Sequence, residues 1–425
     1  MTHHRTLGAG LAALALATLA APALAGTTSH LEQVAVVDGT GEQLPFSSGG
    51  SGTGQLTSAD GTRTVFATDA PLVASDDNGI EDVYVRDTVA GTTTLVSQRD
   101  GHPGNDFSAN PTISADGQRV AFITWATDLT GAEDTNGSEL DAVVADLGTG
   151  DIELVSQTTA GFQRDRSTVD AVISGDGRFV AFQTFGSFGI KDDDRKEDVY
   201  VRDLEAGRTT QVSLLPNTNR DVRGSVLVGG ISDDGTRVTF GDANHLWMRD
   251  TAARRTTRFW QEPDSPPCQP FPSGSAGRPA ISGNGRFAAF ASCATDLPGE
   301  NGKATDVYRV NLASGRIVRV NKVGNDHSFL PSLSRTGRFV AFGSDASNLV
   351  AGDDEGKVDA FLTDLRERTT IRVSQAADGT GGNRQNGAND VVVNRTGTAV
   401  SFQTYADNLV PGDTQDQREV LVWHR

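Results

Sequence analysis

The chain has 425 residues and a formal net charge of −18 at pH 7, with 55 acidic and 37 basic side chains. This negative charge disfavours nucleic acids and anionic membranes as partners, because their phosphates would be repelled. Forty-eight glycines with only two methionines favour a turn-rich β protein over a helical one.

The first 25 residues have the pattern of an export signal. Arg5 precedes an apolar run from Leu7 to Ala21, and a small-residue cleavage site, Ala23-Leu24-Ala25, follows. An apolar run of about 15 residues is shorter than the roughly 20 that a transmembrane helix needs. We therefore expect a signal peptide over 1–25, one domain over 26–425, and a secreted or periplasmic protein without membrane insertion.

A short N-terminal segment, Leu31 to Val36, lies ahead of a glycine-rich loop and a series of seven repeats. Each repeat has the pattern Ser-x-x-Gly with a Phe five positions after the Gly, and the seventh copy has Asn394 in place of Ser. The glycines recur every 50 to 60 residues. Such a period predicts one supersecondary unit, repeated so that neighbouring copies bury each other's apolar faces. The Phe residues are expected to fill the space between units; they are Phe66, Phe122, Phe182, Phe240, Phe290, Phe342 and Phe402.

The second copy shows the unit most clearly. Four short strands are predicted at Pro111–Ser114, Arg119–Thr124, Asp141–Asp146 and Ile152–Ser156, and Asp116-Gly117 supplies the tight turn between the first two. Four antiparallel strands repeated seven times predict an all-β fold, a seven-bladed β-propeller.

The seventh copy contains only three of the four strands, at residues 391–394, 398–404 and 419–423. The segment Leu31–Val36 stands where a fourth strand precedes every other repeat. We therefore predict that the N-terminal strand completes the last blade and removes an exposed sheet edge.

The fourth copy departs from the others. Its second and third strands are joined only by Asp242-Ala243-Asn244, and a Pro-rich insert follows its fourth strand. Cys268 lies in this insert and Cys293 in the next repeat. Export favours a disulfide between them, and two separate thiols remain the alternative.

The repeats resemble the TolB-like and WD40-like propeller repeats of the Tol-biopolymer-transport type. The resemblance rests on the turn, on the strand Val120-Ala121-Phe122 and its equivalents, and on a third strand that reads Asp-Val-Tyr-Val-Arg-Asp at both Asp82–Asp87 and Asp198–Asp203. It covers essentially the whole chain after the signal. It implies the propeller fold and little about function, because propellers serve as binding modules and as enzymes.

Loops between second and third strands carry oxygen-bearing side chains at alternate positions, a Gly, and a later carboxylate. This pattern resembles a Ca²⁺ loop, although none has the full EF-hand spacing. The candidate ligands are Asp76, Asn78 and Asp82; Asp134, Asn136 and Asp141; and Asp353 and Asp359. The loop from Asp192 to Asp198 is similar. In the alternative interpretation, Asp and Asn form Asx-turns and the final Asp anchors the strand.

Two classes of enzyme would place specific demands on this sequence. A serine peptidase would need a Gly-x-Ser-x-Gly elbow, which the sequence lacks. Some pectin-degrading lyases resemble this fold and bind a metal through several histidines. His102, His245 and His327 come from different blades and are expected on one face, as a metal site or as solvated surface residues.

We interpret the chain as an exported, monomeric, non-catalytic module that binds a protein or a glycan, with Ca²⁺ as its candidate ion and no assigned catalytic residue. A carbohydrate-active lyase or glycoside hydrolase is the alternative. An enzyme should have a deep pocket where carboxylates or histidines converge, whereas a binding module should present a broad face.

Overall fold

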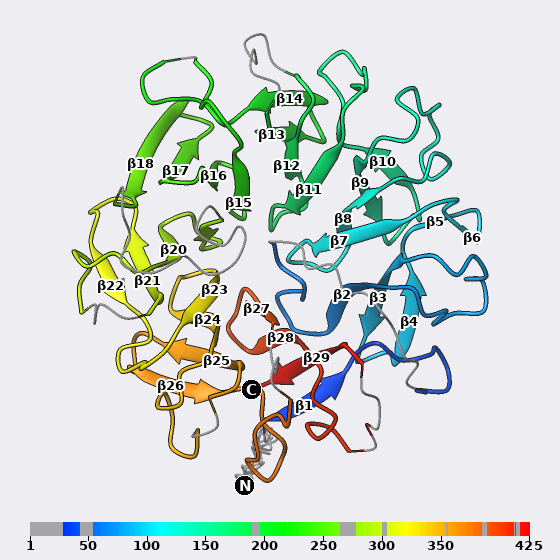
Figure 1. Ribbon diagram of the computed structural model, residues 1–425. Coiled ribbons are helices and arrows are strands. Elements are labelled where there is room, and N and C mark those ends of the chain that lie inside the picture. Colours follow the sequence, from blue (N-terminus) through cyan, green and yellow to red (C-terminus); the bar gives the residue numbers. More distant parts are fainter. Residues whose placement is uncertain are drawn as a thin grey trace, which may run out of the picture.

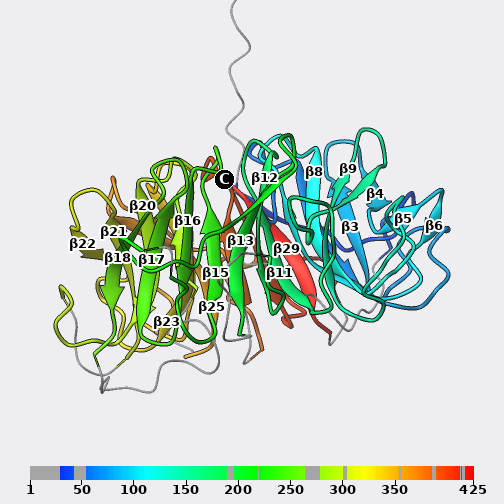
Figure 2. The ribbon, with the colours of Figure 1, turned by 90° about the horizontal axis from the view of Figure 1, so that it is seen from above.

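The strands of the protein form a ring of seven antiparallel sheets around a central axis (Figure 1). The computed structural model describes residues 29–42, 54–188, 196–218, 220–263, 278–299, 304–353, 356–384, 389–411, 413 and 417–425. Viewed from the side, the ring is a flat disc with loops on both faces (Figure 2). The described residues include no helix that is long and apolar enough to cross a membrane.

Each sheet radiates from the axis, and its strands follow one another in sequence from the inner to the outer edge, except that β1 forms the outer edge of the seventh sheet. The first three sheets hold β2 (Arg63–Thr68), β3 (Asp82–Asp87) and β4 (Thr92–Leu95); β7 (Ser108–Ile113), β8 (Arg119–Thr124), β9 (Asp141–Asp146) and β10 (Ile152–Leu154); and β11 (Thr168–Ile173), β12 (Phe179–Thr184), β13 (Asp198–Asp203) and β14 (Arg208–Gln211).

The fourth to sixth sheets hold β15 (Leu227–Ile231), β16 (Arg237–Gly241), β17 (His245–Asp250) and β18 (Arg255–Gln261); β19 (Ala280–Ile281), β20 (Phe287–Ser292), β21 (Asp306–Asn311) and β22 (Ile317–Arg319); and β23 (Ser328–Leu333), β24 (Phe339–Ser344), β25 (Asp359–Asp364) and β26 (Thr369–Arg372). The seventh holds β27 (Asn389–Val393), β28 (Ala399–Thr404), β29 (Glu419–His424) and β1 (His30–Gln33). A small hairpin, β5 (Gln98–Arg99) and β6 (His102–Pro103), lies outside the first blade.

The seven-bladed propeller predicted from the repeats is confirmed. Strands β8 and β9 have the predicted bounds, whereas β7 begins at Ser108, three residues before the predicted start. The inner strand continues past Pro111 because a β-bulge lies between Ala109 and Thr112. Asn110 lies in this bulge and adopts a left-handed backbone conformation, with a φ of 51°.

The repeated turn is held together by its own side chains. In the second blade the hydroxyl of Ser114 donates a 2.5 Å hydrogen bond to Asp116 and accepts one of 3.0 Å from the backbone N–H of Arg119. Gly117 adopts a φ of 70°, as the predicted tight turn requires. In the seventh blade the carboxamide oxygen of Asn394 accepts the corresponding N–H, that of Ala399, at 3.1 Å. The exchange of Ser for Asn therefore preserves the turn.

The seven repeat Phe residues are all buried, with exposed fractions of 3% or less. Several stack on an aromatic residue of the neighbouring strand in the same blade, as Phe182 does on Tyr200 and Phe342 on Phe361. The prediction that these side chains pack the blades is confirmed, and none of them is available for a ligand.

The two ends of the described chain meet in one blade. Strand β1 pairs antiparallel with β29, so that His30 lies opposite His424 and Gln33 opposite Leu421 (Figure 1). The predicted closure by the N-terminal strand is confirmed. The strand ends at Gln33, three residues earlier than predicted, but Val34 to Val36 continue as buried residues beside the same sheet.

The fourth blade has the short connection predicted for it. Between β16 and β17 the backbone N–H of Asp242 donates a 3.0 Å hydrogen bond to the carbonyl of His245, which makes a tight turn. Cys293 follows β20, is buried, and is not a free thiol. Cys268 lies outside the described residues, so the disulfide pairing stays a prediction.

Candidate functional site

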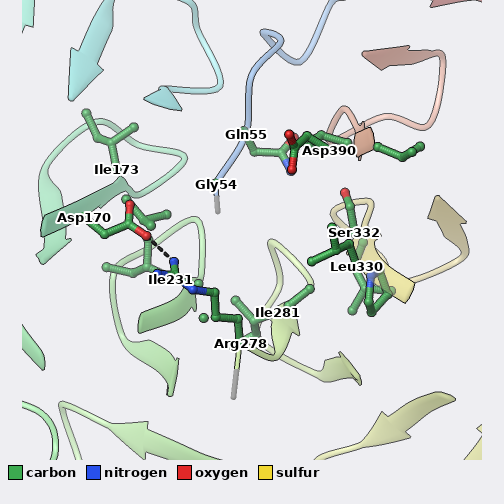
Figure 3. A pocket seen from close by; sticks show the side chains of 18 of the residues that line it. Gly54, Gln55, Asp170, Ile173, Ile231, Arg278, Ile281, Leu330, Ser332 and Asp390 are labelled. Carbon is green, nitrogen blue, oxygen red and sulfur yellow. Dashed lines mark hydrogen bonds and ion pairs between the residues drawn. The ribbon is translucent and has the colours of Figure 1, made fainter. Parts of the chain in front are cut away.

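A cavity of about 320 Å³ lies on the axis of the ring, between the inner strands (Figure 3). Its surface is polar and apolar in about equal parts, and the apolar part includes Ile173, Ile231, Ile281, Leu333 and Val392, which come from five blades. Residues near the start of the inner strands add polar groups from different blades; they are Gln55, Asn110, Asp170, Arg278 and Asp390. We call this space the central cavity.

Backbone irregularities shape the wall of the central cavity. The inner strands β7, β11, β15, β23 and β27 each contain a register shift at the same level. Asn110, Leu330 and Asp390, one in each of three bulges, have φ values near +50° and line the cavity. In the fourth blade, glycines occupy this level, and a side chain on Gly229 would overlap the backbone of Pro279 in the next blade. The bulges thus allow the blades to approach closely and still present polar side chains to the axis.

An ion pair crosses the polar end of the cavity. Arg278, just before β19, donates a hydrogen bond to the carboxylate of Asp170 in β11, two blades away (Figure 3). Asp170 is 2% exposed and Arg278 is partly exposed. A buried carboxylate needs such a partner because its desolvation is costly. The pair therefore fixes the spacing of the third and fifth blades at this level.

Three charged residues from the repeated turns meet at the opposite end of the central cavity, and we call them the axial cluster. Arg395 of the seventh blade contacts Asp233 of the fourth, and Arg335 of the sixth donates a 2.9 Å hydrogen bond to the same carboxylate. Arg395 also lines the cavity and is 6% exposed. Burial lowers the pKa of Arg395 to about 10, so its guanidinium still carries its charge at neutral pH.

Glycines make room for the axial cluster. The position after the turn Ser is Gly175 in the third blade, and a Cβ there would lie 2.6 Å from a carboxylate oxygen of Asp233 and 2.9 Å from the guanidinium carbon of Arg395. Around the same level, backbone hydrogen bonds join turns of neighbouring blades, for example Ala115 N–H to the carbonyl of Gly175 at 2.9 Å. This end of the ring is therefore tightly connected.

The acidic loop of the first blade is built around Asp82, the first residue of β3. Ser97 donates a 2.5 Å hydrogen bond to one carboxylate oxygen, and the amide of Asn78 donates one of 2.9 Å to the other. Burial raises the pKa of Asp82 to about 6, although these hydrogen bonds act in the opposite direction. Asp76 is 5% exposed, and the hydroxyl of Tyr84 donates to it. Asn78 also accepts the N–H of Ile80 at 2.8 Å, as an Asx-turn does.

The second blade repeats this arrangement. Asp141 begins β9 and accepts hydrogen bonds from Ser156 at 2.6 Å and from Gln163 at 2.9 Å. Burial raises its pKa to about 6, and the charge of Asp134 raises it further. Asp134 accepts the backbone N–H of Asn136 at 3.0 Å. The Asp and Asn side chains of these two candidate Ca²⁺ loops thus form turns and anchor the strands that follow.

The sixth blade differs from the first two because it contains an internal cation. Arg372 lies with one guanidinium nitrogen 3.8 Å from Asp353 and 3.5 Å from Asp359, while Ser374 anchors Asp359 at 2.5 Å. In the fifth blade Arg319 has the same place relative to Asp306. The predicted Asp353 and Asp359 ligands are therefore close together, but a guanidinium already neutralises them. Asp192 lies outside the described residues.

The three histidines predicted as a possible metal site are not brought together. Among the described residues, the one group of three or more His, Cys, Asp or Glu side chains with ligand atoms within 4.8 Å of each other is His30, Glu32 and His424. His102 is exposed, His245 contacts Asp242 at 3.0 Å, and His327 accepts the N–H of Thr305 at 3.1 Å. Surface or turn roles account for these three.

The central cavity and the axial cluster were missed from the sequence. The two residues after each turn Ser vary, and nothing in one repeat shows that Asp233, Arg335 and Arg395 meet. The group of His30, Glu32 and His424 had a signal in the sequence, because the predicted ring closure places Leu31–Val36 beside the strand that ends near His424.

No protein-family model matches the chain, and no curated protein matches it in sequence. Among solved structures, oligogalacturonate lyase from Vibrio parahaemolyticus is similar, with 11% identity, a TM-score of 0.53, and coverage of 93% of this chain and 97% of that chain. The β-propeller domain of the Trilobed protease from Pyrococcus furiosus has 10% identity, a TM-score of 0.52, and coverage of 89% and 92%. TolB from Acinetobacter baumannii has 15% identity, a TM-score of 0.39, and coverage of 69% and 59%.

These similarities show the fold alone. The chain is a seven-bladed β-propeller, structurally similar to the propellers of an oligogalacturonate lyase and of the Trilobed protease. The function has to be argued from the site.

Proposed function

We propose that this protein is an exported, non-catalytic binding module that takes an aliphatic part of a protein partner into the central cavity. The observation that carries the proposal is the cavity itself, which has a volume of about 320 Å³ and a wall that combines aliphatic side chains of several blades with polar and charged groups. A pocket with an apolar body and a few convergent polar groups is the usual form of a ligand site.

The chemistry of the wall favours a peptide over a sugar. A glycan in the cavity would place some hydroxyl groups against Ile173, Ile231, Ile281 and Leu333, where they would lose hydrogen bonds to water, and only the hydroxyl groups that reach the polar part of the wall would regain them. An aliphatic side chain of a peptide would bury apolar surface there instead, and its backbone could reach Asn110 and the other polar groups.

The same wall argues against catalysis. The lining residues that the structure describes include no His and no Cys. The carboxylate of Asp170 is already bonded to Arg278, and the hydroxyl of Ser332 accepts the N–H of Val393 at 2.9 Å. A lyase or hydrolase would need a metal-binding set or two carboxylates placed to act together, and of the two carboxylates in this wall, Asp170 and Asp390, the first is engaged by Arg278.

The proposal is tested with a displayed library of random peptides. The variant Leu330→Trp fills the cavity and leaves the backbone strain unchanged, since Leu330 already has a positive φ of 48°. The matched control is Val323→Trp, at a residue that is 60% exposed outside the cavity. We expect aliphatic-rich peptides to be enriched on the parent and on Val323→Trp, and to be lost on Leu330→Trp.

Equal enrichment on all three proteins would overturn the cavity as the binding site. Cleavage of polygalacturonate by the parent, lost in Leu330→Trp, would replace the binding module by the enzyme alternative.

A further inference from the structure

A set of two histidines and one glutamate lies at the seam where the first and last strands meet. His30 and Glu32 are two residues apart in β1, so their side chains extend from the same face of the sheet. His424 in β29 is paired directly with His30. Both strands therefore bring metal-binding side chains to one place, and we call these three residues the seam group.

The side chains of the seam group are in contact. The rings of His30 and His424 are stacked, with centroids 5.0 Å apart and planes at 21°. The Nε2 atom of His424 lies 3.5 Å from a carboxylate oxygen of Glu32. Each residue offers one ligand atom, and all three atoms lie within 4.8 Å of one another. In a tetrahedral zinc site with bonds of about 2.0–2.1 Å, ligand atoms are about 3.3 Å apart, so small rotations complete the site.

The environment of His424 adds an independent observation. Its Nε2 atom is buried and makes no hydrogen bond within the described part of the structure, whereas the side chain as a whole is 18% exposed. A buried imidazole nitrogen that faces a carboxylate and a second imidazole, without a hydrogen bond of its own, is placed to bind a cation.

We propose that the seam group binds a divalent transition metal, with Zn²⁺ as the reference ion. Two imidazoles and one carboxylate leave a fourth position for water, and nitrogen ligands select zinc-like metals over Ca²⁺ or Mg²⁺. The ion joins β1 to β29, the two strands that close the ring. Binding therefore stabilises the closed ring in proportion to the metal concentration relative to Kd.

Isothermal titration with Zn²⁺ tests the site on untagged, EDTA-treated protein. The protein is prepared as residues 26–425, without the expected signal peptide, so that His3 and His4 do not contribute. We expect one Zn²⁺ per chain and a rise in Tm of at least about 2 °C in excess Zn²⁺. Neither Ca²⁺ nor Mg²⁺ should compete.

The variants His30→Ala and Glu32→Gln should each weaken Zn²⁺ binding at least about tenfold and reduce the rise in Tm. His30 is exposed at the start of its strand, so its replacement should leave the metal-free Tm within about 1 °C of the parent. The control His102→Ala, at another exposed histidine, should bind like the parent.

No saturable Zn²⁺ binding by the parent, or parent-like binding by both seam variants, would overturn the proposal. If His30→Ala does not fold, the Zn²⁺ titration of Glu32→Gln alone tests the proposal. These results do not depend on the peptide experiment, because the seam group lies in the seventh blade at its outer pair of strands and not in the cavity wall.

Discussion

The guanidinium of Arg319 lies 2.6 Å from the carboxylate of Asp306 inside the fifth blade. The corresponding place in the first blade, two residues before the hydrogen-bonding Ser97, is occupied by Leu95. The second blade likewise has Leu154 before Ser156. Blades with an arginine thus carry their own cation beside the buried carboxylates, and the first two blades do not.

This difference predicts where Ca²⁺ should act. We expect millimolar Ca²⁺ to raise Tm by about 2–4 °C, and Mg²⁺ to have less effect because it demands a tighter octahedron. Asp134→Asn should reduce the response to Ca²⁺. Asp353→Asn should lower Tm in EDTA, since Arg372 loses a carboxylate, and should leave the response to Ca²⁺ unchanged.

Thermal melts in EDTA, Ca²⁺ and Mg²⁺ at matched ionic strength provide the measurement. Identical curves would leave the loops of the first two blades as Asx-turns and strand anchors only.

Glu419 predicts a pH dependence of stability. Burial, followed by the charge of Asp413, raises the pKa of Glu419 from 4.5 to about 9. The folded protein therefore holds a proton that the unfolded chain releases. The stabilisation is complete below about pH 4.5 and is lost as the pH rises through about 9.

Replacing this carboxyl by a neutral amide, Glu419→Gln, should raise Tm at about pH 8 and change it little at about pH 4. The exposed Glu153→Gln serves as the control and should shift neither value. A wild-type Tm that does not fall between these two pH values relative to Glu419→Gln would show that the carboxyl is not held protonated.

The tight packing of the axial cluster predicts that one added methyl group lowers the stability of the protein. Gly175→Ala should lower the free energy of unfolding by about 1–3 kcal/mol, because the new Cβ would crowd Asp233 and Arg395. Gly131→Ala is the matched control, since its nearest neighbour is a nitrogen of Arg99 at 3.5 Å. Denaturant unfolding measures both. A Gly175→Ala protein as stable as the control would mean that Asp233 and Arg395 can shift to accommodate the new Cβ at little energetic cost.

Ring closure predicts the effect of removing residues 31–36. This deletion takes away most of β1 and the buried residues Val34 to Val36, and it exposes the edge of β29. A loss of Tm of more than about 5 °C, or aggregation, is expected, and differential scanning fluorimetry with light scattering would record either. Parent-like melting would contradict the role of this strand.

The cysteines give a prediction that needs only mass spectrometry. Alkylation without reductant should leave Cys268 and Cys293 of the exported protein unlabelled, and the two peptides should be recovered joined. Two labelled thiols would disprove the bond. Since Cys293 is buried, the labelling is done in denaturant.

The repeat period and turn chemistry were sufficient to predict the blades. The turn at Asp116-Gly117 sets the register of β8, and β8 in turn fixes β9, so local signals determine both strands. The start of β7 could not be predicted, because it depends on a bulge at Asn110 in the pairing of β7 with β8, which no turn motif of the sequence marks.

The central cavity could not be predicted from the sequence, for a similar reason. Asp170 and Arg278 are 108 positions apart, and only the geometry of the closed ring brings them together. Sequence patterns within a repeat predict the strands and turns of a single blade. They carry no information about the residues at the axis, where side chains of different blades meet.

The pairing of β1 with β29 also determines how the protein responds to a single protease cut. A cut in the loop between β8 and β9 leaves two fragments that remain joined on both sides, by the β8–β9 pairing and by the β1–β29 pairing. We expect the nicked protein to migrate as one particle under native conditions and as two bands in SDS. The ring can therefore stay assembled after its chain has been cut.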